Sequence, residues 1–146
     1  MEANGLALDT DVLVSDLRGK TSFLQNLEDR DLFTTVVNAF ELFHGAYKSK
    51  EKSTNLPATR GLLMSLRILG FELEIAERAG EVLAKAQKSG EDVEIRDLLI
   101  GCIARERGLA LLTYNVKHFR HIPGLRVVDA AKLLEEPKPE GSSADG

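Results

Sequence analysis

The chain has 146 residues, of which 23 are acidic and 19 are basic, giving a formal net charge of −4. This length corresponds to one ordinary domain with enough residues to bury a hydrophobic core. No segment approaches the roughly 20 apolar residues of a membrane helix, and the N-terminus lacks the basic start and apolar stretch of a signal peptide. We therefore expect a cytoplasmic protein that does not enter a membrane.

The composition also excludes several classes of site. With one cysteine, Cys102, the chain can form neither a disulfide framework nor a thiolate zinc site, so oxygen or imidazole ligands would have to hold any metal. The absence of tryptophan and the 5% aromatic content argue against the base-stacking platforms of single-strand-binding proteins. Four acids and one lysine among Pro, Gly and Ser at 135–146 predict a disordered acidic tail after a single domain over 1–134.

Predicted strands and helices alternate along the chain. Apolar residues at intervals of four, three and four from Val36 to Tyr47 predict an amphipathic helix, whereas the alternation from Phe71 to Ile75 predicts a half-buried strand. The polar residues 48–57 predict a loop that leads into the next helix. In chain order the predicted elements are strand 5–8, helix 12–19, a short helix 24–27, strand 32–35, helix 36–47, helix 58–69, strand 71–75, helix 76–89, helix 93–108, strand 109–113 and strand 125–128.

This alternation predicts an α/β fold with a mostly parallel sheet, in one domain and without internal repeats. In such sheets ligands collect beyond the carboxyl ends of the strands. Four polar residues are expected near those ends. Asp9 follows the first strand, and Glu41 lies in the helix after the second. Asp97 lies in the first turn of a later helix, and Asn115 follows the fourth strand.

Each of these side chains alone has an ordinary structural explanation. Asp9 could cap a helix or form a turn, and Glu41 could be a solvated helix residue. Asp97 could complement the helix dipole, and Asn115 could be a turn residue. Their convergence changes the interpretation, because three carboxylates at one rim cannot all stay ionised without a cation. A hard divalent ion such as Mg²⁺ or Mn²⁺, held by carboxylates and water, resolves that conflict.

Four segments resemble, in order, the motifs of the PIN domain family, and most closely its VapC toxins of toxin–antitoxin pairs. They are residues 8–14 (LDTDVLV), 35–45 (TVVNAFELFHG), 97–104 (DLLIGCIA) and 113–119 (TYNVKHF), the last followed by 122–127 (IPGLRV). The first motif alone is a weak signal, but the four in order, with family-like gaps, are specific. The resemblance covers residues 6–128.

The resemblance implies a three-layer α/β/α sandwich with a mostly parallel central sheet and a metal-dependent endoribonuclease activity. Asp9, Glu41 and Asp97 then correspond to the acidic residues of the metal site, Asn115 takes a fourth position and Thr113 lies beside it. The implied cofactor is Mg²⁺ or Mn²⁺. The implied partners are an RNA substrate, a VapB-like antitoxin and a second copy of the chain, bound through first-half helices such as residues 58–69.

Several residues depart from the family pattern or have no assigned role. Asp11 stands where the family usually has Asn, and Gly101 where it often has Ala; a turn role is favoured for Asp11. Two further residues are possible additional metal ligands: His44, one turn beyond Glu41, and Glu94, just before Asp97. For Glu94 the preferred interpretation is that it marks the start of a helix.

The sequence also offers basic residues and histidines near the expected site. The H-x-x-H pair His118 and His121 lacks a third nearby ligand and is interpreted as surface. Five bases in the second half are expected to form a basic surface near the site: Arg105, Arg107, Lys117, Arg120 and Arg126.

Three other functions compete with the nuclease. The segment Asp9–Val12 also matches the nucleophile motif of haloacid-dehalogenase-type phosphatases, but the late acidic pair that such enzymes need is missing. A dinucleotide-binding fold would need a Gly-rich first turn, which the chain lacks. The main alternative is therefore a catalytically idle PIN-like domain used for binding or assembly. Retention of three mutually repelling carboxylates favours the enzyme.

Overall fold

The computed structural model describes residues 5–135, so the acidic tail predicted for 135–146 lies almost wholly outside the described residues. The strands are β1 (Leu6–Leu8), β2 (Leu32–Thr35), β3 (Arg67–Leu69), β4 (Ala110–Thr113) and β5 (Val127–Asp129). The helices are α1 (Thr10–Leu17), α2 (Phe23–Asn26), α3 (Val36–Lys48), α4 (Lys52–Met64), α5 (Leu73–Lys88), α6 (Ile95–Glu106), α7 (Ala130–Glu135) and the 3₁₀ helix η1 (Val116–Phe119). Among them no helix combines the length and the apolar character needed to cross a membrane.

The five strands form one sheet in the order β3-β2-β1-β4-β5, and every neighbouring pair is parallel. β1 lies in the centre, with Leu8 in register with Leu112 of β4 and Ala7 in register with Phe33 of β2. Because all strands run the same way, the residues that follow β1, β2 and β4 emerge at one edge of the sheet.

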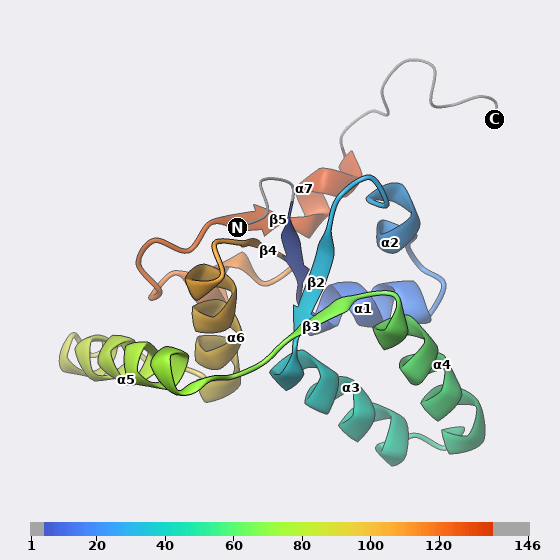
Figure 1. Cartoon of the computed structure of the whole chain (residues 1–146), viewed down its shortest axis with the longest axis horizontal. Helices are drawn as coiled ribbons and strands as arrows, with labels where there is room; N and C mark the ends of the chain where they lie inside the picture. Colours follow the sequence, from blue (N-terminus) through green and yellow to red (C-terminus); the bar gives the residue numbers. More distant parts are fainter. Residues whose placement is uncertain (1–4, 136–146) are drawn as a thin grey trace.

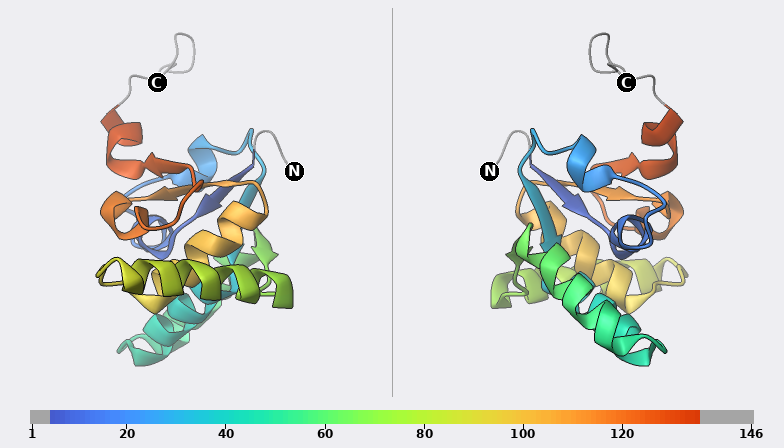
Figure 2. Two further views of the ribbon diagram at one scale, coloured as in Figure 1. Left: turned by 90° about the vertical axis from the view of Figure 1, so that its left-hand side faces the viewer. Right: turned by 90° about the vertical axis from the view of Figure 1, so that its right-hand side faces the viewer.

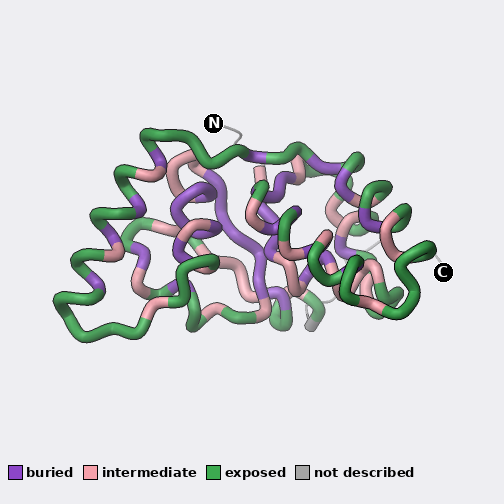
Figure 3. The backbone as a smooth tube through the Cα atoms, turned by 90° about the horizontal axis from the view of Figure 1, so that it is seen from below, coloured by how far each residue is buried: buried purple, intermediate pink, exposed green. Residues whose placement is uncertain are grey.

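Helices cover both faces of this sheet (Figure 1). One core contains Ala7 and Leu111 of the sheet with residues of α5 and α6, and the other contains Leu8 and Leu112 with residues of α1, α3 and α4. Successive strand residues thus enter opposite cores, as the pleat requires. Figure 2 shows α5 crossing in front of α6, and Figure 3 shows the buried backbone in the middle of the molecule. The predicted three-layer α/β/α sandwich is confirmed.

Two predicted boundaries in the middle of the chain are wrong. Residues 48–57 are not a loop, because α4 already begins at Lys52 and contains Pro57. Proline removes one helical hydrogen bond, but Thr59 and Leu63 are buried on this helix, so its packing outweighs the weak local signal. The helix ends at Met64 rather than at Leu69.

The third strand is correspondingly displaced. It covers Arg67–Leu69, and the alternating residues 71–75 are not a strand because α5 begins at Leu73. Leu73 is exposed and Ile75 is buried in the first turn of α5. An alternation over only five residues therefore fits a helix start as well as a strand. The helices η1 and α7 are not among the predicted elements.

Candidate functional site

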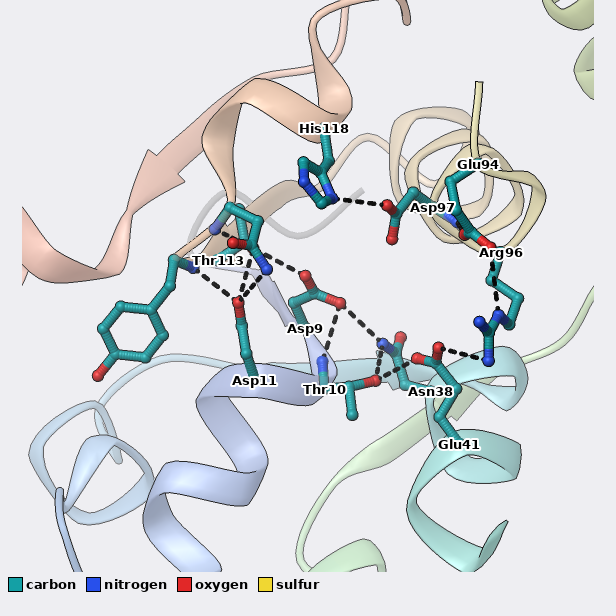
Figure 4. Close-up of polar contacts among 12 residues, drawn as sticks. Asp9, Thr10, Asp11, Asn38, Glu41, Glu94, Arg96, Asp97, Thr113 and His118 are labelled. Carbon is teal, nitrogen blue, oxygen red and sulfur yellow. Dashed lines mark hydrogen bonds and ion pairs between the residues drawn. The ribbon is translucent and has the colours of Figure 1, made fainter. Parts of the chain in front are cut away.

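Asp9 occupies the centre of the site, directly after β1 (Figure 4). Its backbone N–H donates to Leu112 O of β4, and its side chain caps α1 by accepting a hydrogen bond from Thr10 N at 2.8 Å. Thr113 Oγ donates to Asp9 Oδ2 at 2.7 Å, and Asn38 Nδ2 donates to Oδ1 at 3.1 Å. Burial raises the pKa of Asp9 above its usual value, although these hydrogen bonds act to lower it.

Glu41 reaches the same site from α3. Thr10 Oγ donates to Glu41 Oε1 at 2.5 Å, and Asn38 Nδ2 contacts Thr10 Oγ at 2.9 Å, so Asn38 links Asp9 with Thr10. Thr35 and Asn38 form a capping box that fixes the start of α3. Asn38 is not among the residues predicted for the site, although its position three residues after the Thr35 cap was a signal for it.

Asp97 approaches from the first turn of α6. Glu94 caps this helix by accepting a hydrogen bond from Asp97 N at 3.0 Å, as its preferred helix-start role predicts. The Asp97 Oδ2 atom lies 3.0 Å from His118 Nδ1. Burial raises the pKa of Asp97, and the His118 contact acts to lower it. His118 is exposed, as its surface interpretation predicts, but its ring also contacts a site carboxylate, which the interpretation did not include.

An arginine of α6 completes this side of the site. Arg96 Nη1 lies 3.6 Å from Glu41 Oε2 and Arg96 Nε lies 3.4 Å from Glu94 Oε2, so one guanidinium joins α3 to the start of α6. The Arg96 side chain is half-exposed, and such pairs contribute little to stability. Arg96 is not among the residues predicted for the site.

Asp11 contacts the segment after β4. Its Oδ2 atom accepts hydrogen bonds from Tyr114 N at 3.2 Å and from Asn115 Nδ2 at 3.0 Å. Its Oδ1 atom is buried without a partner among the described residues. Burial, reinforced by the charge of Asp9, raises the pKa of Asp11 to about 6. Asp11 therefore does more than form a turn, because it holds Asn115 against α1.

These side chains line one cleft of about 640 Å³, and Asp9, Asp11, Glu41, Asp97 and Asn115 are all in its wall. Thr113 is fully buried behind Asp9 and supports it. His44 lies away from the cleft, exposed and stacked on Phe40.

The donors in this cleft suit a hard cation. Carboxylate oxygens are the ligands that Mg²⁺ prefers, and a cation would favour the ionised forms of acids whose pKa burial has raised. As they stand, no three His, Cys, Asp or Glu side chains within residues 5–135 are gathered closely enough to hold a metal ion. Arg96 and His118 instead contact Glu41 and Asp97, so these contacts would have to change when a cation binds.

The expected basic surface is largely absent from the site. Arg105 pairs with Glu106 at 2.9 Å and Arg107 pairs with Glu72 at 2.7 Å, both at the end of α6 that lies away from Asp97. The helix has 12 residues, so its two ends are about 18 Å apart. Arg126 donates to Gly108 O, before β4 begins. Only Lys117 and Arg120 of the five line a cleft that Asp97 shares.

The sequence pattern of the PIN domain matches residues 6–125. The chain belongs to the PIN domain family. Two relatives of this PIN domain are nucleases by name. The tRNA(fMet)-specific endonuclease VapC of Salmonella typhimurium is 29% identical over 125 residues, covering 84% of this chain and 95% of that protein. Ribonuclease VapC10 of Mycobacterium tuberculosis is 30% identical over 118 residues, covering 78% of this chain and 85% of that protein.

Solved structures give the same assignment for this PIN domain. A chain of the DNA-bound VapBC from Salmonella typhimurium is 27% identical, superposes with a TM-score of 0.79, and covers 86% of this chain and 98% of its own length. A chain of VapBC2 from Rickettsia felis bound to a promoter DNA fragment is 26% identical, with the same TM-score and the same coverage of both chains. The fold and family predicted from the four motifs are therefore confirmed.

Proposed function

We propose that this PIN domain is a divalent-metal-dependent endoribonuclease and the toxin of a VapBC-type toxin–antitoxin pair. One observation carries the proposal: Asp9, Glu41 and Asp97, from three separate elements, line one cleft at the carboxyl edge of a PIN-domain sheet. The names of the relatives, which are VapC ribonucleases, support the reaction class. An idle binding domain would gain nothing from carboxylates that burial makes harder to ionise.

Asp9, Glu41 and Asp97 are the residues that would hold a Mg²⁺ or Mn²⁺ ion. When bound, such an ion stabilises negative charge on a phosphate and lowers the pKa of water. In this conformation the Arg96 guanidinium lies beside Glu41, and a ring nitrogen of His118 is hydrogen-bonded to Asp97.

The remaining residues orient the site. Thr113 and Asn38 donate to opposite oxygens of Asp9, so the carboxylate cannot rotate freely. Asn115 gives an amide hydrogen to Asp11, and its amide oxygen stays available to accept a hydrogen bond from water or from an RNA hydroxyl. Precise placement of this kind is what makes a preorganised site effective.

The proposed partners follow from the relatives. VapBC structures pair a toxin with an antitoxin, and we infer a VapB-like antitoxin for this chain. A homodimer remains part of the proposal. First-half helices carry exposed apolar side chains: Phe40 and Tyr47 on α3, and Met64 on α4, which ends five residues earlier than expected.

The test is cleavage of RNA by the purified chain. Cleavage should require Mg²⁺ or Mn²⁺, stop when EDTA is added, and be lost in Asp97→Asn. The matched control is Asp29→Asn, an exposed carboxylate on the turn before β2 and outside both clefts that Asp97 lines, which should cleave normally. Circular dichroism should show the same fold in all three proteins. Equal cleavage by Asp97→Asn, or none by the unaltered chain with any divalent ion, would exclude the proposal.

A further inference from the structure

The cleft that holds the carboxylates extends along α1 to a second group of polar side chains. Ser15, Arg18, Lys20 and Thr21 line it together with the acids. Among the described residues in its wall, Arg18 and Lys20 are the only bases. Asp11 and Arg18 are seven residues apart, which corresponds to about 10 Å along the α1 axis. One cleft therefore has an acidic end and a basic end.

The basic end is held in a fixed conformation. The N–H groups of Gly19 and Lys20 donate to Asp16 O and Ser15 O, both at 3.0 Å, which is the Schellman pattern of a helix end. Gly19 has φ +72, a conformation that side chains rarely adopt. The turn that carries Arg18 and Lys20 is thus closed by backbone hydrogen bonds.

Asp16, the acid nearest to Arg18 and Lys20 in the sequence, already accepts three hydrogen bonds from other groups. Asp16 Oδ1 accepts hydrogen bonds from Thr21 Oγ at 2.5 Å and Phe23 N at 2.8 Å, and Asp16 Oδ2 accepts one from Leu24 N at 2.9 Å. Within residues 5–135 neither Arg18 nor Lys20 forms an ion pair, and both are exposed. Their charges are therefore available to a ligand.

We propose that Arg18 and Lys20 bind a backbone phosphate of the RNA strand whose scissile phosphate lies at the carboxylates. This assignment rests on the proposed nuclease function. Arg18 and Lys20 present a guanidinium and an ammonium, which donate hydrogen bonds and accept none. A phosphate, which only accepts, matches that set.

A phosphate fits better than a carboxylate of an acidic peptide. The four acids at the other end repel any polyanion, so a strand that reaches them needs positive charge elsewhere along its path. A nucleic acid repeats its phosphate along the chain, so one strand can place one phosphate at each end of the cleft.

The test is RNA binding in the Asp97→Asn background, where cleavage does not interfere. A short single-stranded RNA of mixed sequence is titrated at several salt concentrations by fluorescence anisotropy. Arg18→Gln/Lys20→Gln should weaken binding about tenfold and reduce the slope of log K against log salt by about 0.7, since the two bases contact one phosphate and each phosphate contact on a single strand contributes about 0.7. The control Lys88→Gln/Lys132→Gln removes the same charge from exposed positions outside this cleft and should change neither quantity.

Three results would overturn the phosphate site. The Arg18/Lys20 variant could bind RNA with the same affinity and salt slope as the protein that keeps both bases. Alternatively, the Lys88/Lys132 control could lose as much RNA affinity as the Arg18/Lys20 variant. The variant could also keep RNA binding while losing binding to an oligoglutamate peptide, which would assign the turn to an acidic peptide. In cleavage assays the double variant with Asp97 intact should show a raised KM and an unchanged kcat. If the unaltered chain cleaves RNA and the variant behaves like it, the nuclease proposal stands and only this site fails.

Discussion

Replacing Asp11 by Asn tests the electrostatics of the cleft without removing a proposed metal ligand. Burial and the Asp9 charge raise the pKa of Asp11 from 3.8 to about 6, so the folded protein binds this proton more tightly than the unfolded chain does. The folded state then holds more protons between about pH 4 and about pH 6, and stability falls as pH rises through that window. Asn removes the charge and keeps an acceptor for Asn115.

Raising the pKa of Asp11 from 3.8 to about 6 would correspond to about 3 kcal/mol without screening. Because the Asp11 side chain is only partly buried, solvent screening reduces this to about 1–2 kcal/mol. Urea unfolding of both proteins in EDTA at about pH 4 and about pH 7.5 measures it. The unfolding free energy of Asp11→Asn, measured relative to that of the unaltered chain, should increase by about 1–2 kcal/mol from the lower to the higher pH.

The matched control is Asp29→Asn, an exposed acid on the turn before β2, for which the difference from the unaltered chain should not change between the two pH values. The Asn side chain also places an amide where Asp11 has a buried oxygen without a partner among the described residues, which could alter stability equally at every pH. Comparing how the unfolding free energy changes with pH removes that constant effect. Parallel stability curves for Asp11→Asn and the unaltered chain would refute the inferred electrostatics.

Three further predictions concern packing, hydrogen bonding and metal. Gly101→Ala would place a methyl group against Ile122 Cδ1, so unfolding in urea should show a loss of about 1–3 kcal/mol, mostly restored by adding Ile122→Val. Thr113→Val leaves a buried oxygen of Asp9 without its donor, and the same assay should show a loss of about 1–3 kcal/mol. Mg²⁺ at about 100 times its Kd should stabilise the unaltered chain by about 2.7 kcal/mol in thermal unfolding and leave Asp97→Asn unchanged.

The layers of the fold could be predicted because apolar strands alternate with amphipathic helices over most of the chain. The prediction failed at residues 52–75, where the local signals were weak: Pro57 suggested a start rather than a second turn, and five alternating residues suggested a strand. Burial of Leu63 and Ile75 against the rest of the molecule decides those elements. Contacts of that kind are not visible in local spacing.

The site was predicted at the carboxyl edge of the sheet, because parallel strands bring the residues that follow them, such as Asp9 and Asn115, to the same edge. Asp9, Glu41, Asp97 and Asn115 line one cleft as expected. The contacts of His118, Arg96 and Asp11 could not be predicted, since they depend on how α6, α1 and the segment after β4 approach one another. The prediction of a basic surface was wrong for the same reason. Lys117 and Arg120 line a cleft with Asp97 near the start of α6, whereas Arg105 and Arg107 lie at the other end of that helix.

The central claim is that Asp9, Glu41 and Asp97 act together as one metal site. The most direct test is the rate of RNA cleavage by Asp9→Asn, Glu41→Gln, Asp97→Asn and the triple variant, each checked for folding by circular dichroism. Residues that act as a unit are not additive, so each single change should reduce the rate on the order of a hundredfold or more, and the triple variant should lose little beyond that. Full activity in any single variant, or losses that simply multiply in the triple variant, would contradict the claim.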